Sequence, residues 1–546
     1  MNPRAVALCL AGVLAAGAHE KKIYPERWVY VSRSLREDRH VEDIRGIAET
    51  AARHGLTAIL LAGGADRMSL QPPEYFERLK RVRDIAAGHK LELIPAGFNT
   101  GYGGSLLAHD RNLAEGMPVR GALYVAGEGE ARFTPDGAPE LLNGGFEDGV
   151  SGFTVTGAGA ADTAAVREGK GSLRLEASAS GAGARIEQTV KVKPYRQYRL
   201  RFWLRSAGAE PAPGFSVRAV ARGQRNLCYF EPRVPPSPEW REYAAGFNSW
   251  YADEVRLSAG LGGRRTGTLW IDGMRLEEVG LVNVIRREAT PLVVRNEKTG
   301  QVYAEGADYG RVTDPLMDFR YDHDGPPITL PSGSRIRPGD RLRVDYFHGF
   351  TIYRDQVSAC PSDPRIFEAW AKQIPLIEKH WQPKRYFLNF DEVRVAGHCD
   401  SCKRRMKTES MAQILAGTVT AVYKMIRAAN PKAQVFVWSD MFDPNHNSRP
   451  NYYLVEGDFT GSWKYLPKDM RIACWYFARR EKSLEHFSGL GFKTLAAAYY
   501  DADDLDNVAG WLDALDRTPG AMGIMYTTWE NKYQLLPGYG DMVARR

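Results

Sequence analysis

The sequence lacks any basic run interleaved with aromatic residues, and its formal net charge of +7 is spread along the chain. Nucleic-acid-binding proteins gather Lys and Arg in such runs, so nucleic acid is not an expected partner. Past the first residues, no hydrophobic run is long enough to cross a bilayer, so we expect no membrane span. Cysteine is scarce as well. Five of the six remain after residue 18, so at least one stays free unless it pairs between chains.

The first residues follow the pattern of a secretory signal peptide. Arg4 precedes the apolar run Ala5–Ala16, and the small residues up to Ala18 fit a cleavage site before His19. We therefore expect residues 1–18 to be removed and the mature protein to be secreted or periplasmic.

At 546 residues the chain is too long for one ordinary hydrophobic core, and its local patterns divide it. Residues 19–139 and 359–546 alternate short buried strands with amphipathic helices. Residues 140–281 have the pattern of strands throughout, with Ala and Gly linkers, as in an inserted β-sandwich. Residues 282–358 stay β-rich, and they fit either the sandwich or the alternating body.

Eight buried strand patterns occur in the two alternating regions. They are Trp28–Ser32, Thr57–Ala62, Leu91–Pro95, Tyr386–Phe390, Val435–Trp438, Ile472–Phe477, Thr494–Tyr500 and Gly523–Thr528. Eight such strands alternating with helices predict an α/β fold, namely a (β/α)8 TIM barrel interrupted by an all-β jelly-roll sandwich.

The most informative stretch is KRYFLNFDEVR, from Lys384 to Arg394, in which a buried strand ends in the adjacent carboxylates Asp391 and Glu392. In the predicted barrel, functional side chains gather where the strands end. Two acids in one cleft take different pKa values and can take different roles. The alternative is an ordinary strand end with two solvated acids.

The other strand ends carry aromatic rings, acids and one arginine. The set is Arg33, Asn99, Tyr102, Trp438, Asp440, Trp475, Tyr499, Asp501, Trp529 and Glu530. Trp stacks on the apolar face of a sugar ring while acids and Arg bind its hydroxyls, so the set predicts an oligo- or polysaccharide ligand. Trp438 or Trp475 alone would be better explained as a core residue. His348, in the β-rich segment, is a weaker site candidate because a single His is more often structural.

The order of these strand ends resembles glycoside hydrolase family 20, the β-N-acetylhexosaminidases, over roughly residues 26–104 and 360–535. The resemblance implies an exo-acting, retaining glycosidase in which the substrate's own 2-acetamido group is the nucleophile. Asp391 would orient that group, and Glu392 would protonate the leaving oxygen and then activate water. The three Trp residues and Tyr499 would enclose the acetamido group, and no catalytic cofactor is implied. The family's His-rich stretch after the second strand is absent.

The predicted sandwich opens with LLNGGFEDG and closes with a Trp-Ile-Asp sequence at Asp272. These ends resemble carbohydrate-binding modules of secreted polysaccharide-degrading enzymes, in which acids near both ends often hold a structural calcium. The resemblance implies Glu147 and Asp272 as calcium ligands. The alternative is two solvated turn acids, since calcium needs six to eight oxygens.

Two cysteines, Cys399 and Cys402, follow the adjacent carboxylates at C-x2-C spacing. Such a pair can bind zinc, but no second ligand pair lies at suitable spacing. For an exported protein we expect instead a disulfide of Cys360 with one of them.

Two other functions stay open on the sequence. The first is a glycosidase for a sugar without an acetamido group, with Glu392 as acid and Glu530 or Asp440 as nucleophile or base. The second is a non-catalytic glycan-binding protein in which the sandwich binds the ligand and the barrel is inactive.

Overall fold

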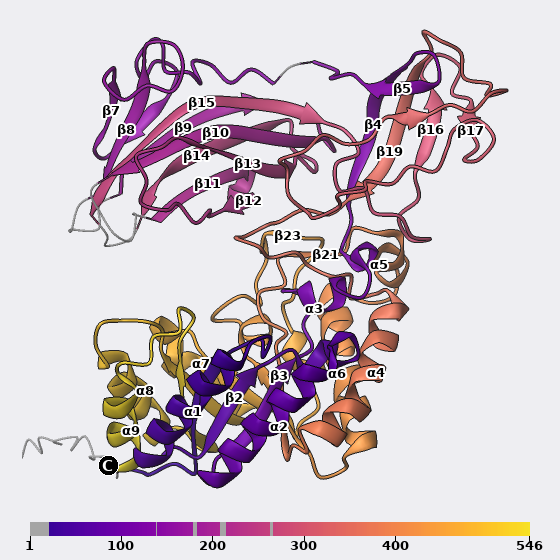
Figure 1. Cartoon of the computed structure of the whole chain (residues 1–546). Coiled ribbons are helices and arrows are strands. Elements are labelled where there is room, and N and C mark those ends of the chain that lie inside the picture. Colours follow the sequence, from indigo (N-terminus) through magenta and orange to yellow (C-terminus); the bar gives the residue numbers. More distant parts are fainter. Residues whose placement is uncertain (1–20, 138, 178–182, 208–213, 263–265) are drawn as a thin grey trace, which may run out of the picture.

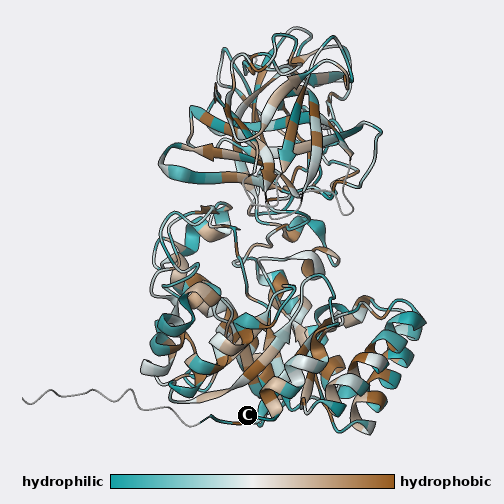
Figure 2. Cartoon of the chain, turned by 90° about the vertical axis from the view of Figure 1, so that its left-hand side faces the viewer, coloured by the Kyte–Doolittle hydropathy of each residue, from teal (hydrophilic) through white to brown (hydrophobic). Residues whose placement is uncertain are grey.

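The computed structural model describes residues 21–137, 139–177, 183–207, 214–262 and 266–546. In these ranges the chain forms a barrel ringed by helices and a β-rich body above it, joined by a narrow waist (Figure 1, Figure 2). The signal peptide expected over residues 1–18 lies outside the described residues. None of the helices in the described ranges is long and apolar enough to cross a membrane.

Eight parallel strands close into a barrel in the order β1-β2-β3-β20-β22-β24-β25-β26. Their bounds are Glu26–Ser32, Ala58–Ala62, Glu92–Gly97, Arg385–Leu388, Gln434–Trp438, Arg471–Cys474, Lys493–Tyr499 and Ala521–Thr527. These are the eight strands expected from the sequence. Side chains of Trp28, Leu60, Phe387 and Phe436 fill the barrel interior, while alternate residues pack outward against the helices.

Helices cover the outside of the barrel. They are α1 (Asp38–Arg53), α2 (Pro73–Gly88), α4 (Pro364–His380), α6 (Met411–Ala429), α7 (Arg480–Gly489), α8 (Asp506–Asp516) and α9 (Leu536–Ala544). The sequence of α6 shows why it forms. Ser410 and Gln413 make a reciprocal capping box at its start, and its apolar face, which includes Leu415 and Val422, is buried. Pro431 lies just beyond its end and cannot continue it.

The prediction of an α/β fold with a (β/α)8 TIM barrel is wrong for this chain. In the described ranges, strand residues outnumber helical residues, and the barrel itself is formed by parallel strands alone. Of the 26 strands in the described residues, only eight belong to the barrel. The strand–helix repeat also fails between β22 and β24. That stretch, which is described throughout, holds two 3-10 turns and β23 (Leu454–Val455) but no α-helix.

Two five-stranded antiparallel sheets form a sandwich between β3 and β20. One sheet has the order β13-β10-β15-β8-β7 and the other β12-β11-β14-β9-β6. Bounds in the first sheet are Arg241–Asn248, Gln197–Ala207, Gly267–Val279, Ser172–Ala177 and Gly159–Asp162. Bounds in the second are Arg225–Phe230, Gly214–Ala221, Glu254–Gly262, Arg185–Lys191 and Thr154–Thr156. Along β10, Tyr198, Leu200, Phe202 and Leu204 alternate into the shared core, as expected for sheets that pack face to face.

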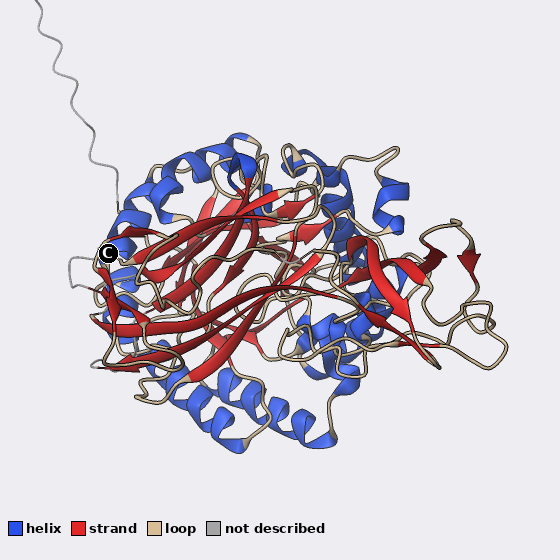
Figure 3. Ribbon diagram, turned by 90° about the horizontal axis from the view of Figure 1, so that it is seen from above, coloured by secondary structure: helices blue, strands red, loops and turns tan. Residues whose placement is uncertain are grey.

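A third sheet has the order β17-β16-β19-β4-β5-β18. Its strands are Val302–Tyr303, Val293–Asn296, Arg341–His348, Met117–Ala126, Glu130–Phe133 and Ile328–Thr329. Residues 282–358 therefore form a separate sheet together with β4 and β5, which precede the sandwich in the sequence. Seen from above, the long strands of the β-rich body lie across the ring of helices (Figure 3).

The waist is built around the loop that follows β20. The short strand β21 (Val395–Ala396) in this loop pairs with β23, and the loop then enters α5 (Asp400–Arg405). All three elements lie between the barrel and the β-rich body (Figure 1). The loop that carries the adjacent carboxylates therefore faces both bodies.

Candidate active site

Three acids meet beyond the ends of two neighbouring barrel strands. Asp391 and Glu392 follow β20, and Asp440 follows β22. The backbone N–H of Glu392 donates to Asp440 Oδ2 at 2.9 Å, and Asn99 Nδ2 donates to Asp391 Oδ1 at 2.7 Å. In a regular strand adjacent side chains face opposite ways, but Glu392 has a left-handed backbone with φ of 47°, so the strand has ended there. We call Asp391, Glu392 and Asp440 the acid trio.

Burial favours the protonated form of two members of the acid trio. Burial, together with the charges of Asp440 and Glu392, raises the pKa of Asp391 well above its ordinary value. Burial and the charge of Glu392 raise the pKa of Asp440 to about 7. Neighbouring carboxyls resist ionising together, so Asp391 and Asp440 hold at least one proton between them near neutral pH. Carboxyl groups held close together with shifted pKa values are what general acid–base catalysis requires.

Glu392 makes a separate set of contacts on the waist side. Arg394 Nη2 lies 2.7 Å from Glu392 Oε1, and the Tyr102 hydroxyl donates to Oε2 at 2.7 Å. Gln356 Nε2 donates to the Glu392 carbonyl at 2.7 Å. The Glu392 side chain is 20% exposed, so a ligand can reach it, whereas Asp440 is fully buried.

Sequence reasoning missed Arg394, although it ends the informative stretch. Its side chain is 6% exposed, and its guanidinium lies 4.5 Å from the Tyr353 ring centroid and 5.1 Å from that of Tyr453. The available signal was an arginine set between two apolar residues, Val393 and Val395, which are both buried here. A buried arginine is nearly always paired, and its partner here is Glu392.

Four aromatic rings meet beside the acid trio. The Trp529 ring centroid lies 5.5 Å from Tyr30, 6.0 Å from Trp438 and 6.3 Å from Trp475. Trp475 Nε1 donates to Asp440 Oδ1 at 3.3 Å, which joins these rings to the acid trio. Trp438 is buried and Trp529 is 47% exposed, so the rings run from the barrel interior to the surface. We call these four residues the aromatic cluster.

The aromatic cluster contains the three predicted Trp residues but not Tyr499. The buried Tyr499 ring stacks on Tyr526 at 4.3 Å in the core between the barrel and its helices. Strand alternation from Ala497 would turn Tyr499 inward, but its backbone has φ of 89°, so alternation has ended there. Tyr30 occupies the aromatic cluster instead. The sequence could have indicated Tyr30, because it lies two residues after Trp28, whose side chain points into the barrel.

The other predicted residues near the barrel end hold loops. Asp501 accepts the N–H of Trp529 at 2.7 Å and of Glu530 at 3.2 Å, and thereby fixes the loop that carries both. Glu530 pairs with Lys532 at 3.1 Å. Arg33 lies on the same side, because it donates to Asn531, and it pairs with Asp43 at 2.9 Å.

His348 lies outside the candidate site, in the third sheet. It is fully buried in β19, where Asn248 Nδ2 lies 2.9 Å from Nε2 and the Tyr321 hydroxyl lies 3.0 Å from Nδ1. Burial lowers the pKa of His348 to about 3. The neutral ring therefore joins the sandwich to the third sheet, which is the structural role that a single His more often has.

The two acids expected to hold calcium tether a turn of the sandwich. Asp272 accepts the backbone N–H groups of Arg167 and Glu168 at 2.8 and 3.2 Å, and Glu147 accepts that of Lys170 at 2.9 Å. Neither acid belongs to a metal-sized group of His, Cys, Asp and Glu side chains among the described residues. Their oxygens already accept N–H groups and provide only part of the six to eight ligands that calcium takes. Calcium here stays a prediction.

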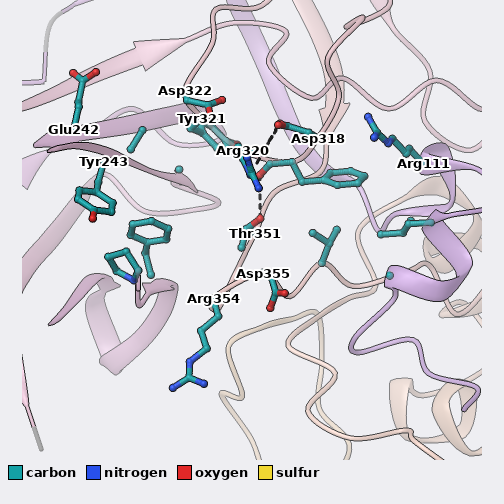
Figure 4. Close-up of a pocket in the computed structure, with 18 of the residues that line it drawn as sticks. Arg111, Glu242, Tyr243, Asp318, Arg320, Tyr321, Asp322, Thr351, Arg354 and Asp355 are labelled. Atoms are coloured by element: carbon teal, nitrogen blue, oxygen red, sulfur yellow. Dashed lines mark hydrogen bonds and ion pairs between the residues drawn. The ribbon is translucent and has the colours of Figure 1, made fainter. Parts of the chain in front are cut away.

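Two adjoining cavities lie beside Tyr102, the residue whose hydroxyl contacts Glu392. The smaller, of about 330 Å³, is lined by Asn99 and Tyr102, and the larger, of about 700 Å³, by Arg111 and Tyr243 among others. Figure 4 shows Tyr243 of β13 on one side of the larger cavity and Arg111 on the other. Both cavities are lined by Gly104, Asp355 and Val357, so they form one groove. The groove runs from Tyr102, which contacts Glu392, to the sandwich edge.

Residues 139–258 match the model of a family described as a carbohydrate binding domain. Among solved structures, the chain is similar to TmCBM61 in complex with β-1,4-galactotriose, at 19% identity over 26% of this chain and 99% of that one, with a TM-score of 0.23. It is also similar to the CBM22-1 xylan-binding domain from Paenibacillus barcinonensis, at 16% identity over 27% of this chain and 98% of that one, with a TM-score of 0.22.

A Flavobacterium johnsoniae chitobiase is similar over 96% of this chain, at 8% identity and a TM-score of 0.37. This chain spans 48% of that protein. Among curated proteins, none matches the chain in sequence. The match to the carbohydrate binding domain covers most of the sandwich, and such a domain fits the sugar partner expected from the sequence.

Proposed function

We propose that the chain is an exported glycoside hydrolase whose reaction takes place at the acid trio. The observation that carries the proposal is the contact between the acid trio and the aromatic cluster at one end of the barrel. Partly exposed Trp rings bind the apolar faces of sugars, and a proton held among carboxylates supplies acid catalysis. The carbohydrate-binding match over residues 139–258 supports a glycan as the ligand.

The substrate class in this proposal is a 2-acetamido sugar. Its acetamide oxygen attacks the anomeric carbon while Glu392 gives a proton to the leaving oxygen. Water then opens the cyclic intermediate as Glu392 takes a proton back, so the configuration is retained. Asp391 orients the acetamide. The fully buried Asp440 positions Glu392 by accepting a hydrogen bond from the Glu392 backbone N–H.

In this mechanism Tyr30 has the role that was expected of Tyr499. Burial and the nearby charge of Asp391 raise the pKa of Tyr30, so its hydroxyl keeps its proton and can donate to the acetamide oxygen. Its ring lies 5.5 Å from Trp529, which places the donor beside the rings that would enclose the acetamide methyl group.

The test compares aryl glycosides with and without the 2-acetamido group on the wild-type chain and on Glu392→Gln. We expect hydrolysis only of the acetamido substrates, and a loss of at least ~100-fold in turnover for Glu392→Gln with poor leaving groups. Glu485→Gln, a change at an exposed acid on α7, is the matched control and should leave turnover unchanged. Near-normal turnover by Glu392→Gln would remove Glu392 from the reaction.

A second candidate is a glycosidase for a sugar without the acetamido group. Complete burial of Asp440 keeps it from touching a substrate, which leaves Glu530, 47% exposed at its side chain, as the nucleophile in that mechanism. A thiazoline analogue of the cyclised intermediate should inhibit strongly under the first mechanism, because it resembles the species that the site stabilises. A covalent adduct of a 2-fluoro sugar on Glu530, found by mass spectrometry, would establish the second.

A further inference from the structure

Four buried side chains of metal-ligating type converge at the waist. Glu115 lies just before β4, Cys360 just before α4, and Cys399 and Cys402 at the start of α5. Their ligand atoms all lie within 4.8 Å of one another. The sequence offered only the C-x2-C pair, because the other two ligands come from segments on either side of the β-rich insertion.

We propose that Glu115, Cys360, Cys399 and Cys402 bind one structural zinc ion. A tetrahedral ion with Zn–S bonds of about 2.3 Å separates its sulfur ligands by about 3.8 Å, and separates sulfur from a carboxylate oxygen by about 3.5 Å. Cys360 Sγ lies 3.3 Å from Cys399 Sγ and 3.7 Å from Cys402 Sγ, and Cys402 Sγ lies 3.6 Å from Glu115 Oε2. These separations are already close to those of the bound site, and all five cysteines in the described ranges are free thiols.

The ligands are held in place before any metal binds. Glu115 Oε1 accepts the backbone N–H groups of His398 and Cys399 at 2.8 and 3.0 Å, which leaves Oε2 directed at Cys402. The backbone of Cys399 precedes the first turn of α5, so Cys402 is brought back beside it. Four protein ligands without an open position make a closed site, which is the structural rather than the catalytic type.

A buried arginine offsets the charge of the proposed site. Three thiolates and one carboxylate around Zn²⁺ carry a net charge of about −2. Arg287 lies against Cys360, Cys399 and Glu115, its side chain is 3% exposed, and Nη1 donates to the carbonyls of Asn112 and Ala114. Its Nε lies 3.4 Å from the buried Asp363 Oδ2, and its Nη2 is buried without a hydrogen-bond partner among the described residues. Asp363 therefore neutralises one side of the guanidinium, and the zinc-thiolate centre would place a second anionic group on the other.

The zinc would join three segments that otherwise meet only at the waist. Glu115 belongs to the segment that leaves the barrel, Cys360 to the segment that returns to it, and Cys399 and Cys402 to the loop that carries Asp391 and Glu392. Zinc would therefore fix the loop that carries Asp391 and Glu392 to both ends of the insertion. This role does not depend on the identity of the sugar.

The test measures zinc in the purified full chain by mass spectrometry of the elements. We expect about one zinc per chain in the wild type and less than ~0.1 in Cys402→Ser and Glu115→Gln. Glu115→Gln keeps an oxygen acceptor for the two N–H groups, so it separates the loss of a ligand from the loss of the fold. Cys228→Ala and Cys474→Ala, which change buried cysteines elsewhere, should keep the metal. Cobalt(II) in place of zinc should give the thiolate charge-transfer bands of a tetrahedral site.

Several outcomes would overturn the proposal. A wild-type chain that takes up no zinc from an equimolar supply would exclude the site. Zinc content unchanged in Cys402→Ser would place the metal elsewhere. A disulfide between Cys360 and Cys399 or Cys402, found in alkylated peptides of the native chain, would show that oxidation rather than metal binding joins these segments.

Discussion

Replacing Asp440 by Asn should flatten the dependence of stability on pH. Asp440 accepts hydrogen bonds from the Glu392 N–H, Asn447 Nδ2 and Trp475 Nε1, all of which favour its charged form. Burial and the charge of Glu392 outweigh these donors and raise its pKa from 3.8 to about 7. At high pH the folded chain must therefore keep a carboxylate at a place that favours the neutral acid.

The direction of this pH dependence follows from proton binding. Between the unfolded and folded pKa values, the folded chain holds a proton that the unfolded chain has released, so the free energy of unfolding falls as pH rises. The penalty is absent below pH ~4, where both states are protonated, and complete above pH ~7. The difference between the two pKa values corresponds to a penalty of at most about 4 kcal/mol.

The Asp440→Asn substitution removes this titration, but it also lowers the free energy of unfolding by an amount that does not change with pH. A single amide oxygen faces three donors, so we expect Asp440→Asn to lose about 1–3 kcal/mol where the wild type is protonated. The free energies of the two chains should then converge as pH rises from ~4 to ~8. Urea unfolding followed by Trp fluorescence measures this, with exposed Asp503→Asn as the control. Equal pH slopes for the wild type and Asp440→Asn would refute the reasoning.

Two further substitutions test how the glycan is held. Trp529→Ala should raise KM for small aryl glycosides by about tenfold and lower kcat less, because it removes an exposed stacking surface and no acid; an unchanged KM would place the sugar elsewhere. Tyr243→Ala, in the wall of the groove nearest the sandwich, should weaken binding of a polymeric glycan and leave KM for a small aryl glycoside unchanged. Loss of binding for both substrates would contradict a separate role for the part of the groove that lies between Tyr102 and the sandwich.

The barrel strands could be predicted because each is buried on both faces. Ala58–Ala62 and Lys493–Tyr499 are nearly continuous apolar runs, which is the pattern of strands covered by a core on one side and helices on the other. The connections could not be read in the same way. Between β22 and β24, Trp463 and Leu466 pack against the barrel core without an α-helix. Gly461, with φ of 86°, and Pro467 explain this, since neither suits a helix interior.

The candidate site was predictable only where it lies on the strands themselves. Asp391, Glu392 and the three Trp residues end barrel strands, so the order of the strands was enough to bring them together. Tyr102, which follows the third strand and was also among the predicted residues, donates to the Glu392 carboxylate. Gln356 contacts Glu392 from the segment that returns from the insertion. The position of Gln356 depends on how the insertion folds back on the barrel, and no local pattern in the sequence records that. For the same reason, the sequence does not show that Glu115 lies beside the three cysteines.

A chain of contacts joins the sandwich to Glu392 of the acid trio. This argues against an insertion that only increases the affinity for a polymeric glycan. Arg225 of β12 donates to the Tyr453 carbonyl at 2.8 Å, and the Tyr453 ring stacks on Arg394, the ion-pair partner of Glu392. Arg225→Ala should therefore lower kcat for a small aryl glycoside by about 3–10-fold, because Arg394 is held less firmly.

Arg222→Ala is the matched control, since Arg222 is 74% exposed at its side chain and pairs with Glu254 on the sandwich. The two variants remove the same charge from the same domain, so a difference in kcat reports the contact with Tyr453 and not the net charge. Equal and unchanged kcat values would mean that the sandwich contacts Tyr453 without positioning Arg394. A lower kcat for Arg225→Ala alone, with KM unchanged, would mean that the sandwich takes part in building the candidate active site.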